Sequence, residues 1–250
     1  MPIAADIRDE ASRLSAAALE AGLGMRLMGG LAMWMVSPSV RVPPFAREYG
    51  DLDFAVRQRD NRAVTPFLVD QGYVPERMFN SIHGAQRLNF GHPQERWTID
   101  VVIDALRMSH VIDLHGRLDP GPPTLDLADL LLTKLQVWEI NAKDLGDLTC
   151  LLADRPLAEG GAGGEAIDLK RILALTGTDW GICHTLERNL RKVVEAAQQR
   201  RPAGSAFDPV AQTEQLLAAI AGGRKSVGWQ LRARIGERMR WYEVPEEVRH

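Results

Sequence analysis

The stretch from Asp51 to Val56, with the sequence DLDFAV, limits most strongly what this chain can fold into. Successive side chains of a β-strand point to opposite faces, so Asp51 and Asp53 share one face and the apolar residues share the other. The apolar face requires a core. The two carboxylates repel each other unless they are solvated, protonated or neutralised by a cation. A divalent metal with oxygen ligands and an exposed turn both remain as interpretations of this pair.

The composition is that of a globular protein. The chain has 250 residues, of which 45% are hydrophobic and 25% charged, enough for one large domain or two small ones. The net charge of -3 argues against a strongly basic nucleic-acid coat. Neither a membrane span of about 18 apolar residues nor a signal peptide is evident. Cys150 and Cys183 have no zinc or disulfide spacing, so we expect a cytoplasmic protein with no membrane partner.

Periodicity and turn residues predict an α+β fold. The prolines of 120–123 separate an N-terminal core, 1–120, with a mixed β-sheet flanked by helices, from a helical C-terminal domain, 121–250. We expect the strands at 25–28, 51–56, 73–79, 86–91 and 97–104. We expect the helices at 4–21, 31–36, 60–71, 124–140, 141–152, 168–175, 179–199, 208–221 and 227–240.

Two features before the carboxylate strand suit an anion. Gly29-Gly30 separates a predicted strand from a predicted helix, so the backbone can approach a ligand closely and the N–H groups of the helix start can bind it. A plain strand–helix turn explains the same pair. Arg47 lies in the proline-containing loop 37–49, where it contacts a phosphate or forms a surface ion pair with Asp51.

A third carboxylate lies on a neighbouring strand. The runs 86–91 and 97–104 flank a Pro-containing turn and predict a hairpin, whose second arm carries Asp100 and Asp104 on one face. A carboxylate inside so apolar a strand needs a partner. Asp104 stands next to the turn at Ala105 and suits a strand end that faces water, so Asp100 is the better candidate.

The helical half carries a lysine on an apolar face. Lys134 lies beside the leucine stripe of the predicted helix 124–140, where it snorkels to water or reaches a buried anion. Asp144 and Asp147 share a face of the next helix, which Asn141 would cap. These two aspartates would orient Lys134, orient a bound ligand, or be solvated.

The last predicted helix, 227–240, is strongly basic. Between 224 and 240 six bases against Glu237 leave a surplus of five positive charges, which suits RNA or a nucleotide phosphate, or forms a solvated face. A second pattern on this helix is an apolar stripe, typical of a core, formed by Val227, Leu231, Ile235 and Met239.

The order of these features resembles the nucleotidyltransferase superfamily, the polymerase-β-like enzymes. The matching segments are Gly29-Gly30-Leu31-Ala32, Asp51-Leu52-Asp53 and Ile99-Asp100-Val101. The segments similar to those of the AbiEii-type toxin branch are Leu130-Leu131-Leu132-Thr133-Lys134-Leu135 and Lys143-Asp144-Leu145-Gly146-Asp147-Leu148. The family often has Gly-Ser where this chain has Gly29-Gly30, and Gly-Gly also occurs in the AbiEii and aminoglycoside-modifying branches. The resemblance covers about residues 25–152, and Tyr49 stands where the family often has Thr or Ser.

This resemblance implies a metal-dependent reaction. Asp51, Asp53 and Asp100 would hold one or two Mg²⁺ ions, with Asp100 as the ligand or base nearest the attacking hydroxyl. A nucleoside triphosphate such as ATP would be the co-substrate, and a nucleoside monophosphate would pass to a hydroxyl while pyrophosphate leaves. The residues expected to contact the nucleotide are Gly29, Gly30, Arg47, Lys134 and Asp147.

Three functions remain open at this point. The acceptor would be tRNA, with the protein as the toxin of a toxin–antitoxin pair and an antitoxin as its partner. In the second case the acceptor would be a small cationic antibiotic of the aminoglycoside kind, which acidic side chains would hold. In the third case the protein binds nucleotides without catalysis, although the intact set of three aspartates speaks against that.

Overall fold

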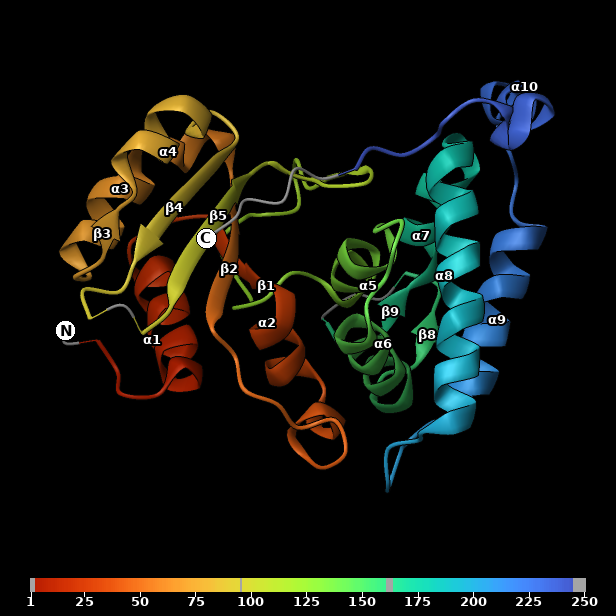
Figure 1. The fold of residues 1–250 in the computed structure, drawn as a ribbon, viewed down its shortest axis with the longest axis horizontal. Coiled ribbons are helices and arrows are strands. Elements are labelled where there is room, and N and C mark those ends of the chain that lie inside the picture. The colour runs from red at the N-terminus through yellow and green to blue at the C-terminus, as the bar shows by residue number, and fades with distance from the viewer. Residues whose placement is uncertain (1–2, 95, 161–163, 245–250) are drawn as a thin grey trace. The chain divides into compact units, whose positions relative to one another are not determined.

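The computed structural model describes residues 3–94, 96–160 and 164–244 (Figure 1). The chain forms two compact units. The first comprises Met1–Met35, Arg47–Leu106 and Asp113–Leu125. The second comprises Val36–Ala46, Arg107–Ile112 and Asp126–His250. The expected break at 120 is close to the boundary at Leu125, but two short segments of the N-terminal half belong to the second unit. Domains at 1–120 and 121–250 stay a prediction.

The first unit is built on a five-stranded sheet of order β1-β2-β5-β4-β3 (Figure 1). The strands are β1 (Met25–Met28), β2 (Asp51–Val56), β3 (Val74–Pro75), β4 (Arg87–Gly91) and β5 (Thr98–Ile103). The helices are α1 (Ile7–Glu20), α2 (Gly29–Val36), η2 (Gln58–Asp60), α3 (Asn61–Asp70) and α4 (Arg77–His83). β2 and β5 are parallel and the other pairs antiparallel, so the sheet is mixed. The expected α+β fold class is confirmed.

The two faces of this sheet differ in polarity. On β2, Leu52 and Phe54 are fully buried, whereas Asp51 is exposed and Asp53 partly exposed. β5 repeats the alternation, and its Asp100 is partly exposed. Since residues two apart on a strand share a face, one side of the sheet forms the core and the other presents the carboxylates.

The strand expected at 73–79 is wrong for most of its length. Only Val74–Pro75 pairs with β4, and the chain then forms the helix α4. Asn80, on α4, accepts a hydrogen bond from the backbone N–H of Asn89 at 2.7 Å and donates one to its carbonyl at 3.0 Å. The Asn80 amide thereby takes the Asn89 N–H that a longer β3 would pair, and it shares the Asn89 carbonyl with the Glu76 N–H, which donates to it at 2.9 Å.

The second unit is mainly helical, as expected. Its elements are η1 (Pro38–Arg41), α5 (Leu127–Leu135), α6 (Ala142–Asp154), β8 (Leu157–Ala158), β9 (Ile167–Asp168), α7 (Leu169–Thr178), α8 (Trp180–Gln199), α9 (Pro209–Gly222), α10 (Val227–Ile235) and η3 (Gly236–Arg238). The parallel pair of β8 and β9 was not expected beyond residue 123. A further short sheet joins β6 (Ala105–Arg107) and β7 (Val111–Asp113).

Side chains set the ends of several of these helices. Asn141 caps α6 by accepting a hydrogen bond from the Asp144 N–H at 2.9 Å, so the predicted cap is confirmed. The helix expected to continue to 140 ends at Leu135. Asn189 donates from its amide to the carbonyls of Leu135 and Val137, at 2.8 and 2.7 Å, and so replaces the bonds of a further turn.

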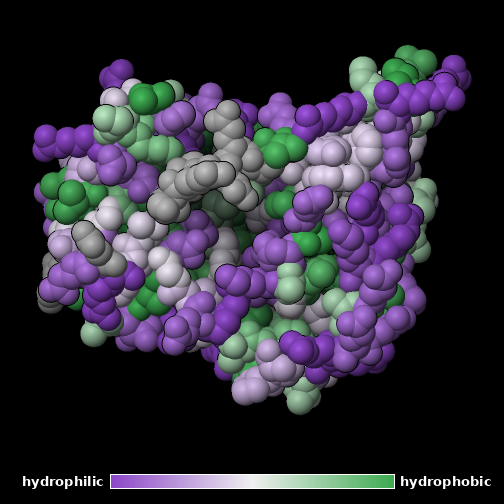
Figure 2. Space-filling model, in the orientation of Figure 1, coloured by the Kyte–Doolittle hydropathy of each residue, from purple (hydrophilic) through white to green (hydrophobic). Residues whose placement is uncertain are grey.

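The apolar stripe expected to be buried on the last helix is exposed. Val227, Leu231 and Ile235 are 73%, 55% and 43% exposed, and hydrophobic residues are visible at the surface over α10 in Figure 2. The helix ends at Ile235 because Gly236 adopts a positive φ of 58°, which stops α-helical hydrogen bonding. Met239, which lies beyond this end, is 52% exposed.

Cys150 and Cys183 are buried free thiols, in keeping with the absence of a zinc or disulfide spacing. Among the described residues, no helix combines the length and the apolar character needed to cross a membrane.

Candidate active site

The centre of the candidate site is a pair of aspartates on the two parallel strands. Asp53 of β2 lies directly opposite Asp100 of β5 in the sheet register. Neighbouring strands are about 4.8 Å apart and opposite residues point to the same face, so the two carboxylates lie side by side. The structure thus brings together two residues that are 47 positions apart in the chain.

Asp51 extends this row toward the start of β2. It lies opposite Thr98, shares the face of Asp53, and is exposed. The exposed face of the sheet therefore carries the three predicted carboxylates, with Asp51 at its rim and the other two further in.

Gly29, the first residue of α2, packs against the Asp53 carboxylate. A Cβ atom at this position would come within 2.0 Å of Asp53 Oδ2, and the backbone φ of 67° is one that glycine adopts without strain. Any side chain here would displace the carboxylate. The predicted glycine pair thus lies at the start of a helix and beside the acidic row, although it begins the helix instead of preceding it.

Arg47 lies over the second glycine. A Cβ atom at Gly30 would come within 3.0 Å of Arg47 Nη2 and of Tyr49 Cε1. The Arg47 guanidinium carbon is 4.7 Å from the centroid of the Tyr49 ring, a cation–π contact. The start of α2 is therefore flanked by a carboxylate at Gly29 and a guanidinium at Gly30. This arrangement places the sequence-predicted Arg47 beside the predicted anion cradle.

Arg87 of β4 is a site residue that no sequence motif indicated. Its Nε donates to Asp100 Oδ1 at 2.7 Å and Oδ2 at 2.9 Å, and its Nη2 also donates to Oδ2. These hydrogen bonds raise the pKa of Arg87; burial opposes the rise, and the charges of Asp100 and Asp53 add to it. The alternating hairpin arm was the available signal, but the Pro-containing turn left the pairing register open.

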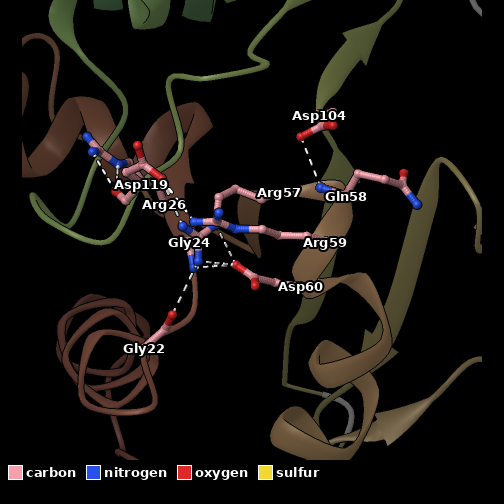
Figure 3. A network of polar contacts seen from close by, with 9 residues as sticks. All are labelled: Gly22, Gly24, Arg26, Arg57, Gln58, Arg59, Asp60, Asp104 and Asp119. Atoms are coloured by element: carbon pink, nitrogen blue, oxygen red, sulfur yellow. Dashed lines mark hydrogen bonds and ion pairs between the residues drawn. The ribbon is translucent and has the colours of Figure 1, made fainter.

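The structure also separates Asp100 from its alternative, Asp104. Asp104 follows the end of β5, has a positive φ of 55°, and accepts a hydrogen bond from the Gln58 backbone N–H at 3.0 Å (Figure 3). Its other oxygen is 3.3 Å from His115 Nδ1. Asp104 therefore binds the loop that follows β2, and Asp100 is the aspartate beside Asp53.

A second charged network fixes β2 at the end opposite the aspartates. Arg57 donates to Asp60 at 2.6 Å and to Asp119 at 2.9 Å, and the same Asp60 oxygen accepts from the Gly24 N–H at 2.8 Å (Figure 3). A Cβ atom at Gly24 would lie 2.1 Å from Arg57 Nε. These contacts hold the strand ends in register, which keeps the aspartate row in place.

The carboxylates of Asp51, Asp53 and Asp100 are oxygen ligands of the type that a hard divalent cation binds. Carboxylate oxygens are the ligands that Mg²⁺ prefers, and the aspartate row already attracts a cation, the Arg87 guanidinium. Within the described part of the chain, however, no group of three or more His, Cys, Asp or Glu side chains is arranged to hold a metal ion. Metal binding by Asp51, Asp53 and Asp100 therefore stays a prediction.

Lys134, in the second unit, reaches a buried anion and does not snorkel to water. Its Nζ is 2.6 Å from Asp144 Oδ1 and 2.8 Å from Asp147 Oδ2, and its side chain is 9% exposed. Burial disfavours the charged ammonium, but the charges of Asp147 and Asp144 outweigh it and raise the pKa of Lys134. Lys134 and Asp147 thus bind each other, and their predicted contact with a nucleotide stays untested.

No protein-family model matches this chain, and no curated protein matches it. Among solved structures it is similar to a candidate nucleotidyltransferase from H. pylori, with a TM-score of 0.36, 12% identity, and coverage of 92% of this chain and 97% of that chain. It is also similar to JHP933 from Helicobacter pylori, with a TM-score of 0.36, 13% identity, and coverage of 91% and 93%.

A further similarity is to the STING-associated CdnE c-di-GMP synthase from Capnocytophaga granulosa, with a TM-score of 0.29, 9% identity, and coverage of 91% of this chain and 80% of that chain. At TM-scores this low, the assignment of a function depends on the residues of the sheet and not on these similarities.

Proposed function

We propose that this protein is a metal-dependent nucleotidyltransferase, which moves a nucleoside monophosphate from a nucleoside triphosphate to a hydroxyl acceptor. The observation that carries the proposal is the row of carboxylates on one exposed sheet face, with Asp53 opposite Asp100 on parallel strands. A helix start, α2, packs against the same row through Gly29. Acidic groups beside backbone N–H donors suit a site that holds both a cation and phosphates.

The residues of the chain divide the chemical tasks. Asp51, Asp53 and Asp100 would hold one or two Mg²⁺ ions. The metal, when bound, would neutralise phosphate charge and lower the pKa of the attacking hydroxyl. An oxygen of Asp100 is the candidate acceptor for the proton of that hydroxyl. Most of the work of such a site is positioning and charge stabilisation.

The phosphates of the nucleotide would be bound at the start of α2, beside the row of aspartates. The N–H groups at the start of α2, at Gly29 and Gly30, are the candidate cradle, and Arg47 over Gly30 is the candidate cation. The nucleotide contacts expected of Lys134 and Asp147 stay predictions, because the Lys134 ammonium is already bound to the carboxylates of Asp144 and Asp147.

For the acceptor we propose RNA, with tRNA as the first case to test. The supporting observation is the surplus of five positive charges between 224 and 240, where Arg224, Arg234 and Arg238 are exposed. Exposed arginines bind a phosphate backbone without reading its sequence. A toxin role would follow if the modified RNA can no longer function, and an antitoxin would then be its partner.

The test is incubation of the protein with each of four labelled triphosphates, Mg²⁺ and either total RNA or aminoglycosides. We expect label in RNA, and label in an aminoglycoside would instead identify an antibiotic-modifying enzyme. Transfer to neither acceptor, with nucleotide binding retained, would favour a non-catalytic nucleotide-binding protein.

Variants of single carboxylates make this test specific to the site. Asp53→Asn should abolish Mg²⁺-dependent nucleotide binding while the protein stays folded, and the matched change in an exposed helix residue, Asp70→Asn, should have no effect. Asp100→Asn should act like Asp53→Asn, whereas Asp104→Asn should not, because Asn can keep both the positive φ and the hydrogen bond from Gln58. Equal binding by all four variants would exclude the metal site.

A further inference from the structure

The candidate metal site already contains a cation that belongs to the protein. Arg87 donates hydrogen bonds to both carboxylate oxygens of Asp100, from Nε and from Nη2. A guanidinium that binds both oxygens of a carboxylate occupies about half of its lone-pair sites and neutralises its charge, so it competes with a metal ion for the same group. The Asp53 carboxylate, directly opposite Asp100, adds a second negative charge near the same guanidinium.

The Arg87 side chain is ordered by Asp100 but remains partly exposed to solvent. Its side chain is 42% exposed, whereas that of Asp100 is 14% exposed, so Arg87 reaches the site from the solvent side. Besides Asp100, a described contact of its guanidinium is the ring of Phe79 on α4, at 5.9 Å from the ring centroid. A long side chain with this exposure can turn into water at little cost, because water replaces its lost hydrogen bonds.

We propose that Arg87 is an internal counter-cation that competes with the divalent metal for Asp100, so that metal binds only when Arg87 leaves the carboxylate. This inference rests on the proposed metal site, and it adds a residue that tunes the occupancy of that site. Two cations a few ångströms apart repel each other, and both need the same oxygens. The metal affinity of the protein is therefore lowered by the free energy that releases Arg87.

A competing cation and a residue that merely orients Asp100 have opposite effects on metal binding. An orienting residue would keep the carboxylate ready for the metal, so its removal would weaken metal binding. A competing cation has the opposite effect, and its removal tightens metal binding. The sign of the change in Kd therefore decides between the two roles.

The experiment measures Mn²⁺ binding to the full-length protein without nucleotide, by calorimetry and by the spectroscopic signal of free Mn²⁺. The variants are Arg87→Met, which keeps an apolar stem, and Arg87→Lys, which keeps the charge but not the planar pair of donors. The matched control is Arg77→Met, the same change at an exposed position of α4. Circular dichroism checks that each variant is folded.

We expect Arg87→Met to lower the Kd for Mn²⁺ by about three- to fivefold, because the release of a partly exposed ion pair costs about that factor in affinity. Arg87→Lys should give a smaller decrease, and Arg77→Met less than about twofold. An unchanged or raised Kd in Arg87→Met would overturn the inference while leaving the metal site intact.

The outcomes also distinguish this inference from the proposed function. If Arg87→Met binds Mn²⁺ more tightly but no acceptor is labelled, the competition stands and the transferase activity fails. If neither the wild-type protein nor Arg87→Met binds Mn²⁺, the metal site fails and the competition fails with it. The double variant Asp53→Asn/Arg87→Met should lose the gain, because the second carboxylate is needed to hold the ion.

Discussion

Each unit of the protein holds a cation against aspartate carboxylates, and the two centres differ in burial. In the first unit Arg87 binds Asp100, and the side chains are 42% and 14% exposed. In the second unit Lys134 binds Asp144 and Asp147, and Lys134 and Asp147 are 9% and 3% exposed. Both centres are ion pairs between a base and aspartate, but only in the first is the cation partly open to water.

This difference teaches which ion pair can exchange its partner. Removing a buried charge from its partner leaves the other charge without solvent, which costs several kcal/mol. An exposed cation instead exchanges its carboxylate for water at a cost of about 1 kcal/mol or less. We therefore infer that the Lys134 centre holds α5 and α6 together, whereas the Arg87 centre can open to admit a ligand.

The largest effect is expected from Lys134→Met. The change leaves Asp147 and Asp144 near each other without their cation, so we expect the free energy of unfolding to fall by about 3–5 kcal/mol. Urea denaturation followed by circular dichroism measures it. A loss below about 1 kcal/mol would break the comparison, since Lys134 would then behave like a surface residue.

The two aspartates of this centre provide a finer test. Replacing Asp147, whose side chain is 3% exposed, should lower the free energy of unfolding more than replacing Asp144, whose side chain is 20% exposed. We expect the unfolding free energy to fall by about 2 kcal/mol for Asp147→Asn and by about 1 kcal/mol for Asp144→Asn, because burial strengthens a charged hydrogen bond. The same denaturation measurement applies. Equal losses would mean that burial does not set the strength of these pairs.

Arg87→Met should change stability least among the charge-removing variants. Its exposed guanidinium contributes less than about 1 kcal/mol to folding, so the denaturation midpoint should stay close to that of the wild-type protein. The control is Arg77→Met on the same helix–strand unit. A loss as large as that of Lys134→Met would show that Arg87 is a structural residue.

The smallest effect concerns pH. The pKa of Lys134 is raised above its ordinary value of 10.5, so its contribution is fully present below the unfolded value and is lost as pH rises through the folded one. The stability difference between the wild-type protein and Lys134→Met should therefore be constant from about pH 7 to about pH 9 and shrink only at higher pH. Denaturation across this range checks it, and a difference that shrinks below about pH 9 would contradict the raised pKa.

Local patterns predicted the parts of the site that depend on one strand or one turn. The alternation around Asp51 and Asp53 identified β2 with its residue limits, and the glycine pair located the helix α2, which begins at Gly29 and not at the expected Leu31. Both patterns act over a few residues, because strand faces and glycine conformations are set by the backbone itself. The third carboxylate, Asp100, was also identified, although its roles as ligand and base stay predictions.

The features that the sequence did not reveal depend on contacts between distant residues. Arg87 meets Asp100 only because the hairpin has a particular register. The helix α4 replaces a predicted strand because Asn80 binds the backbone of Asn89. The stripe on α10 has core-like spacing, yet its residues are exposed, since spacing shows that residues share a face and not what covers that face.

By itself, then, the sequence determined the α+β class, the carboxylate strand, the glycine turn between β1 and α2 and the cap of α6, since each depends on neighbours in the chain. The tertiary structure decided which charges meet. It placed Asp53 opposite Asp100 on parallel strands, and it let Asp104 accept a hydrogen bond from the Gln58 N–H. It also buried Lys134 between the carboxylates of Asp144 and Asp147. The physical reason is that electrostatic partners are chosen by distance in space and by burial, and neither quantity is written in local sequence.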